Sequence, residues 1–289
     1  MTKDEFAALL AEIGGGVEIG IAARRERAAA EQDTLARHDE ELWALLCLGD
    51  ALHQFYRDTL GLVGTAISTI TVSPTQSAMA NWHLVSFNRF AAAFHLMANG
   101  YYFDAMMLAR DLWEVALSLA GLRKDIVTLE QLLSLDAGSI AEAEAKSWAI
   151  DRTIRKQLIQ QNANLSDAAR EAIDTFKRLA NLATHKSKAH LARNLDRILK
   201  KQDILLYPHF DPQSAGVAHN VVSMAAWSLI STLPYLDFAL PATEIGWHAT
   251  YDKVQLAFRE GVAPGNVTIQ AWPEVIERVF GLQLPGKGQ

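Results

Sequence analysis

Apolar residues recur every three or four positions along most of this chain, with charged and polar residues between them. This spacing places the apolar side chains on one face of a helix, where they can pack against other helices. We therefore predict an all-α fold, an irregular bundle of about eight to ten helices with a less regular C-terminal tail.

Helix-breaking and capping residues divide this pattern into segments. Gly14 to Gly16 end the first helix, and Ser73-Pro74 closes a long second helical region. Asn99-Gly100 is typical of a left-handed helix end, and Ser166 is the expected cap of a later helix. The helices expected on this basis span residues 1–13, 17–62, 77–98, 102–122, 126–135, 139–161, 166–201 and 214–239.

The segments also predict how the chain is organised. Helices 77–98 and 102–122 should form an antiparallel hairpin at the centre of one domain, residues 1–240. Residues 241–289 contain more Gly and Pro and should form a peripheral segment packed on this bundle. In this segment we expect helices at 251–259 and 273–280, with residues 267–269 extended.

Composition narrows the function classes. The chain has 289 residues, half of them hydrophobic, and a net charge of −6, which argues against a general nucleic-acid binder but not against a local basic site. The single cysteine, Cys47, excludes an intramolecular disulfide and a cysteine-based zinc site, and we expect it to be buried. The N-terminus does not resemble a secretory signal, and the apolar stretches 59–72 and 215–240 are interpreted as buried helices, so we expect a cytoplasmic protein with no membrane span.

The strongest chemical signal lies within residues 177–190. Arg178, Asn181 and His185 are three and four positions apart, so they share one helix face. Eight basic residues and only two acidic ones occur between positions 174 and 201, a local excess that favours binding of phosphate or an RNA backbone. The expected phosphate contacts are Lys177, Lys186 and Lys188. The alternative is a solvated basic helix face in which His185 is a buried, hydrogen-bonded residue.

This arginine–histidine pair resembles the motif of the HEPN superfamily (higher eukaryotes and prokaryotes nucleotide-binding), whose members are all-helical. Six residues separate Arg178 from His185, and Leu179 stands where the family motif usually has a polar residue. The resemblance implies a metal-independent ribonuclease whose motif lies at a dimer interface. Arg178 would then stabilise the phosphate and His185 would transfer protons at the RNA 2′-hydroxyl, with Asn181 beside them.

A second candidate is the pair Arg110 and Glu114, which lie four positions apart on an otherwise apolar helix and can pair. This R-x-x-x-E pair, followed by Thr184, His185 and Ser187, is similar to bacterial helical domains of which some are associated with phage defence or abortive infection. Functionally, Arg110 and Glu114 would line a pocket with His185. Structurally, they would instead form a polar network that fixes the helix register.

Other patterns point less clearly to chemistry. Asp50 and His53 supply half of a carboxylate di-metal site without a matching partner, so we expect no metal and no cofactor. Five tryptophans in helical patterns are expected in the core (Trp43, Trp82, Trp113, Trp148 and Trp227), and two should hold the C-terminal segment on the bundle (Trp247 and Trp272).

The leading hypothesis is a HEPN-like ribonuclease of a bacterial defence or toxin system, with RNA as substrate and a homodimer as its assembly. Dimerisation is expected through the charged N-terminal helix or through the Arg178–His185 face. The alternative is a non-catalytic interaction or regulatory protein that binds another protein and in which the same polar residues are structural. A bundle that binds a small ligand ranks third.

Overall fold

The computed structural model describes residues 2, 4, 5, 8, 17–134, 137–160, 164–184, 208–236 and 244–281. Within these residues the chain forms helices and no strand, so the all-α prediction is confirmed. The expected helix 1–13 and the part of the 166–201 helix beyond Thr184 lie outside the described residues. The α-helices are α2 (Val17–Glu41), α3 (Trp43–Thr69), α4 (Pro74–Ala98), α5 (Tyr102–Arg123), α6 (Leu129–Leu133), α7 (Ile140–Arg155), α8 (Asp167–Thr184), α10 (Pro212–Ile230), α11 (Glu244–Leu256) and α12 (Val267–Val275).

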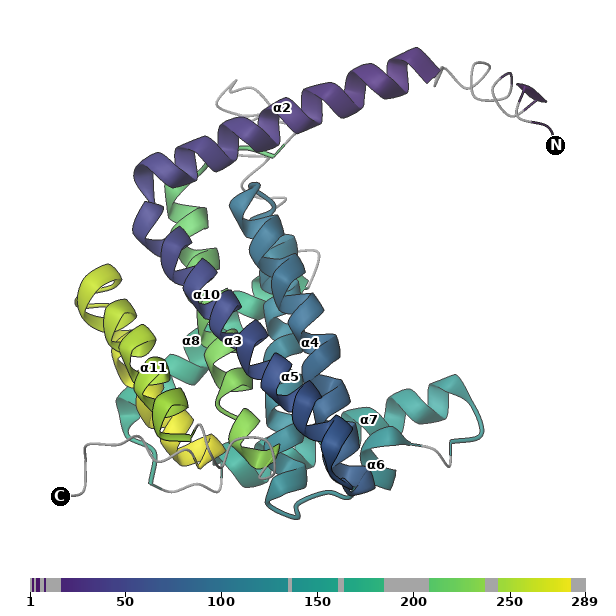
Figure 1. The fold of residues 1–289 in the computed structure, drawn as a ribbon, viewed down its shortest axis with the longest axis vertical. Coiled ribbons are helices and arrows are strands. Elements are labelled where there is room, and N and C mark those ends of the chain that lie inside the picture. Colours follow the sequence, from purple (N-terminus) through teal and green to yellow (C-terminus); the bar gives the residue numbers. More distant parts are fainter. Residues whose placement is uncertain are drawn as a thin grey trace.

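The region expected to be one long helix forms two, α2 and α3, which change direction at Leu42. The N-terminal part of α2 extends away from the other helices, while α3 runs along the body of the molecule (Figure 1). Residues 22–29 of α2 are exposed without interruption, and Thr34 and His38 are the buried residues nearer its end. Only the second half of α2 therefore packs on the bundle.

Helices α4 and α5 form the predicted hairpin. Ser73 does not simply end the preceding region: it caps α4, with its side chain accepting from the Gln76 amide while Gln76 accepts from the Ser73 amide. Gly100 has a φ of +90° between the two helices, as expected for the left-handed end that Asn99-Gly100 predicted. Its missing side chain also leaves room for the backbone of His209, 3.0 Å from where a Cβ would lie.

Helix α10 is the most deeply buried helix among the described residues. All residues from 221 to 230 are buried, because α10 packs against α5, α4, α3 and α8. It ends at Ile230 and gives way to a 3₁₀ turn, Leu233–Leu236, so it is shorter than the expected helix 214–239.

The C-terminal part of the chain contributes to the same core. Trp272 of α12 lies against Trp113 of α5 and Phe176 of α8, with ring centroids 5.4 Å apart in both cases. Phe280 completes this cluster by packing edge-on against Trp113. Residues 267–269, expected to be extended, are instead the first turn of α12, which Asn266 caps. That expectation was wrong because the apolar run Val267 to Ile269 fits a buried helix start as well as a strand.

Two of the tryptophans expected in the core are at the surface. Trp43 is 60 % exposed and Trp148 is 57 % exposed, whereas Trp113, Trp227, Trp247 and Trp272 are buried. Cys47, which was also expected to be buried, is exposed on α3.

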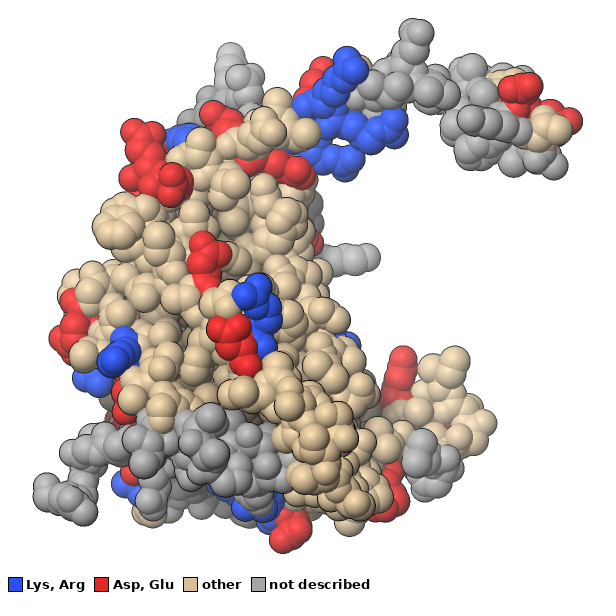
Figure 2. Space-filling model, viewed as in Figure 1, with Lys and Arg blue, Asp and Glu red and all other residues tan. Residues whose placement is uncertain are grey.

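The surface is unevenly charged. Figure 2 shows Lys and Arg gathered on the projecting end of α2 and Asp and Glu near its other end, while the face over α3 carries few charges. No helix in the described ranges is both long enough and apolar enough to cross a bilayer.

Candidate functional site

Helix α8 carries three of the predicted site residues. The Ser166 hydroxyl accepts from the Ala169 amide at 3.2 Å, which confirms it as the helix cap, and Ser166 itself donates to Glu274. The core face of α8 consists of buried alanines and larger apolar residues (Ala169, Ala172, Ile173, Phe176 and Ala180). Arg178 and Asn181, which were expected to share one helix face, are both exposed.

The other three residues of the α8 prediction, His185, Lys186 and Lys188, lie outside the described residues. His185 follows Thr184, the last residue of α8, directly in the sequence.

Lys177 differs from Arg178 in its surroundings. It is only partly exposed, and it lies close enough to Asp174, Arg155 and Glu114 for their charges to affect its pKa. Burial is the largest effect and lowers the pKa of Lys177 below its ordinary value. Lys177 therefore belongs to a cluster between helices, whereas Arg178 faces the solvent.

This cluster contains the second predicted pair, Arg110 and Glu114. The ion pair of Glu114 is with Arg155 of α7, at 3.0 Å from Nη2 to Oε2, and both side chains are less than one-third exposed. Arg110 lies near enough to lower the pKa values of both Glu114 and Asp151. The structure thus brings Arg110 and Glu114 together with Arg155, Asp151 and Lys177, where α5, α7 and α8 meet.

The charges within this cluster only partly offset the energetic cost of burying them. Burial raises the pKa of Glu114, and this effect exceeds the lowering by Arg155 and Arg110. The Nε atom of Arg155 is buried and has no hydrogen-bond partner among the described residues. The cluster thus contains three cationic side chains and two carboxylates.

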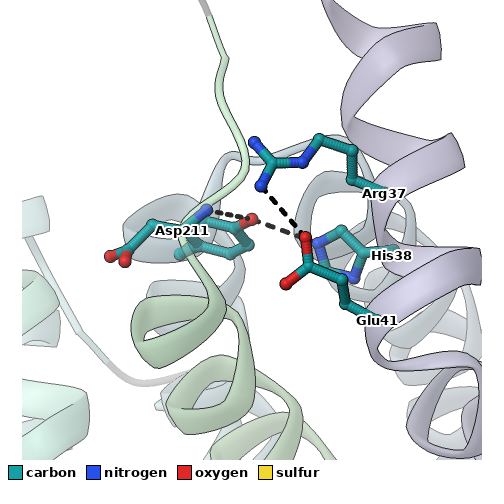
Figure 3. Close-up of polar contacts among 5 residues, drawn as sticks. Arg37, His38, Glu41 and Asp211 are labelled. Carbon is teal, nitrogen blue, oxygen red and sulfur yellow. Dashed lines mark hydrogen bonds and ion pairs between the residues drawn. The ribbon is translucent and has the colours of Figure 1, made fainter.

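A polar centre that the sequence did not predict lies where α2, α5 and α10 meet (Figure 3). His38 Nε2 is 3.1 Å from the Tyr102 hydroxyl, and His38 Nδ1 is 3.4 Å from Nε2 of His219. The Asp211 amide donates to the Tyr102 hydroxyl at 3.4 Å. The three contacts form one chain of hydrogen bonds from Asp211 through Tyr102 and His38 to His219, in which the tautomer of His38 sets the direction of donation.

Both imidazoles in this centre are neutral at pH 7. Burial lowers the pKa of His38 to about 4 and that of His219 to about 3. Beside them Arg37 pairs with Glu41 at 3.0 Å and lies over the Phe210 ring, 4.6 Å from its centroid. No sequence signal could have revealed this centre, because His38 is 64 residues from Tyr102 and 181 from His219.

A third buried contact joins α3, α4 and the end of α10. The Tyr56 hydroxyl is 2.9 Å from His83 Nδ1, and Thr232 Oγ1 is 3.3 Å from His83 Nε2. His83 is fully buried, so this centre holds helices together and is closed to a substrate.

Metal binding is not indicated by these contacts. Among the described residues no group of three or more His, Cys, Asp and Glu side chains is arranged to hold a metal ion. Comparison with known proteins found no matching family model, curated protein or solved structure.

Proposed function

We propose that this chain is a HEPN-like, metal-independent ribonuclease of a bacterial defence or toxin system that acts in the cytoplasm. The observation that carries the proposal is the exposure of Arg178 and Asn181 on α8, while the opposite face of this helix is buried in the core. A rigid helix anchored by Phe176 is a suitable support for groups that must contact RNA with fixed geometry.

In the proposed reaction the RNA 2′-hydroxyl loses its proton to His185 and its oxygen attacks the adjacent phosphorus. The bond from phosphorus to the 5′-oxygen breaks, and the departing oxygen takes up a proton, which leaves a 2′,3′-cyclic phosphate and a 5′-hydroxyl. Arg178 neutralises charge that develops on the phosphate oxygens, and Asn181 orients them.

Basic groups around this face would bind the RNA backbone. Lys177, Lys186 and Lys188 are the proposed phosphate contacts, and the partly buried position of Lys177 suits it to bind a phosphate next to Arg178. We propose that two copies associate, so that an arginine and a histidine from each copy can serve one RNA.

The test is cleavage of a mixed panel of RNA oligonucleotides by purified protein in the presence of EDTA. We expect cleavage by the wild type, and a loss of about a hundredfold or more with Arg178→Ala or His185→Ala. The matched control is Arg89→Ala, which removes an exposed arginine from α4 and should cleave like the wild type. Equal cleavage by all four proteins would contradict the proposal.

The second candidate function is a non-catalytic interaction or regulatory protein. The observation that favours it is the Glu114–Arg155 ion pair, which joins α5 to α7 and has Lys177 of α8 beside it, as a structural network would. Under this alternative none of the RNAs is cleaved, and Glu114→Gln lowers the free energy of unfolding. Binding of a protein partner would then replace cleavage as the activity to measure.

A further inference from the structure

A groove lies between α2, α3 and α4, away from the α8 face. Its volume is about 420 Å³. It is lined by apolar side chains from all three helices and by four polar residues: Leu35, Leu46, Asp50, His53, Ala91, Phe94, His95, Ala98 and Asn99. Apolar walls with a few converging polar groups are typical of a small-molecule site.

One wall of the groove is held in place by a close helix contact. A Cβ at Gly49 would lie 2.1 Å from Cε2 of Phe94, so only glycine allows this ring to lie directly against α3. The Phe94 ring also packs against Phe90 and edge-on against His219, with centroids 6.4 Å apart in both cases. The aromatic wall is therefore preformed.

The two histidines of the groove are also oriented. His53 stacks on Phe87, with ring centroids 4.8 Å apart. The Asn99 amide nitrogen donates to both the backbone oxygen and Nδ1 of His95, at 2.8 and 3.2 Å. Because Nδ1 accepts a hydrogen bond, neutral His95 carries its proton on Nε2.

The charge of the groove is set by Asp50. It is the only Asp, Glu, Lys or Arg among the lining residues. No lysine or arginine in the described part of the chain forms an ion pair with it. Burial raises the pKa of Asp50, with an opposing effect of His53. Burial lowers the pKa of His53, with an opposing effect of Asp50, and so favours the neutral ring. Asp50 nevertheless remains exposed, so its carboxylate can contact a cation that enters the groove from solvent.

We propose that this groove binds a small organic amine, with its ammonium group against the Asp50 carboxylate and its apolar body against Phe94, Leu35 and Leu46. An anionic ligand would be repelled by Asp50, and among the described residues no three His, Cys, Asp or Glu side chains are grouped so that they could hold a metal ion. An aromatic body would gain further from the face or edge of Phe94. This site is independent of the proposed nuclease.

The test uses two probes of nearly equal size, phenethylamine and the uncharged 2-phenylethanol, with binding followed by calorimetry or by NMR shifts at pH 7. We expect phenethylamine to bind at least tenfold more tightly. Asp50→Asn should remove this preference, and Asp58→Asn, which removes a carboxylate of the same helix that does not line the groove, should retain it. Asp50→Lys should reverse the preference toward 3-phenylpropanoate, and circular dichroism will verify that each variant is folded. Equal binding of the two probes by the wild type, or an undiminished preference in Asp50→Asn, would overturn the proposal.

Discussion

Three imidazole rings of this fold are buried, and each contacts a residue distant in sequence through at least one ring nitrogen. His38 and His219 contact each other, while His83 lies between Tyr56 and Thr232. Burial lowers the pKa of His83 to about 3, similar to that of His219. The fold therefore depends on these histidines being neutral.

Stability should consequently fall in acid. The unfolded chain takes up these protons near pH 6.5, whereas the folded chain resists protonation until about pH 4 to 3. The free energy of unfolding is thus highest above pH 6.5 and falls by about 1.4 kcal/mol per pH unit for each such histidine as the pH drops. Urea unfolding between pH 7 and pH 4.5 measures this slope. His219→Gln removes one of the three histidines, so the slope should decrease by about 1.4 kcal/mol per pH unit. An unchanged slope would contradict this account.

The second prediction for single residues concerns the Glu114–Arg155 ion pair. Both side chains are less than one-third exposed, so their coupling should exceed that of a surface ion pair. A double-mutant cycle with Glu114→Gln and Arg155→Met should give a coupling energy of about 1–2 kcal/mol in urea unfolding. The solvent-exposed pair Arg37 and Glu41 serves as the control, with a coupling of about 0.5 kcal/mol or less. Equal coupling of the two pairs would show that the cluster between α5, α7 and α8 is not a structural unit.

Single residues were the hardest feature to predict from the sequence. The spacing of Arg178 and Asn181 predicted a shared helix face but not its exposure, whereas the burial of Trp113 followed from its apolar neighbours. Trp43 and Trp148 could not be placed, because their exposure depends on where α3 and α7 lie in the bundle. Arg155 was missed as the partner of Glu114 because the contact spans two helices.

At the scale of elements, two glycines can be compared. At one of them a side chain would not fit, and at the other it would. Gly100 has a positive φ and faces the backbone of His209, whereas Gly64 lies in α3 with nothing within 4 Å of an added Cβ. The two positions should therefore respond to alanine in opposite directions.

Gly100→Ala should lower the free energy of unfolding by about 1–3 kcal/mol, because alanine is strained at this φ and meets the backbone of residue 209. Gly64→Ala should raise it by about 0.5–1 kcal/mol, because alanine is the better helix former. Thermal or urea unfolding of both variants checks the pair. A similar effect of both substitutions would mean that the α4–α5 turn does not require its left-handed residue.

Elements with strong end signals were predicted well. The bounds of α5 and the cap of α8 follow from local chemistry at Gly100 and Ser166. Ser73 was expected only to close the preceding region, and its role as the cap of α4 was missed. The change of direction at Leu42 has no such signal, since this residue lies between helical patterns and carries no side-chain cap. Packing of α3 on α4 and α10 therefore determines that break, which the sequence pattern alone could not reveal.

At the scale of the whole molecule, the all-α class followed from periodicity, but the sites did not. The histidine centre and the cluster of Lys177 with Glu114 each combine helices that are far apart in the chain, whereas the groove is formed by the consecutive helices α2, α3 and α4. Their arrangement depends on how α10 packs against α5 and α4, which no single segment encodes.

The next prediction concerns the oligomeric state of the protein. We expect a dimer at micromolar concentration in sedimentation velocity, formed through the charged N-terminal helix or through the α8 face. Arg24→Glu with Arg25→Glu should dissociate the first kind of dimer, and Arg178→Glu the second. A monomer at every concentration would contradict the prediction of a dimer and leave each active site within one chain.

The most direct test of the nuclease proposal is a comparison of one cleaved RNA with the same oligonucleotide lacking the 2′-hydroxyl at the cleaved position. The account predicts that the wild type cleaves the first in EDTA, leaves a 2′,3′-cyclic phosphate, and does not cleave the second. It further predicts that Arg178→Ala loses this cleavage and Arg89→Ala retains it. Cleavage of the 2′-deoxy oligonucleotide, or full activity of Arg178→Ala, would contradict the assignment of catalysis to α8.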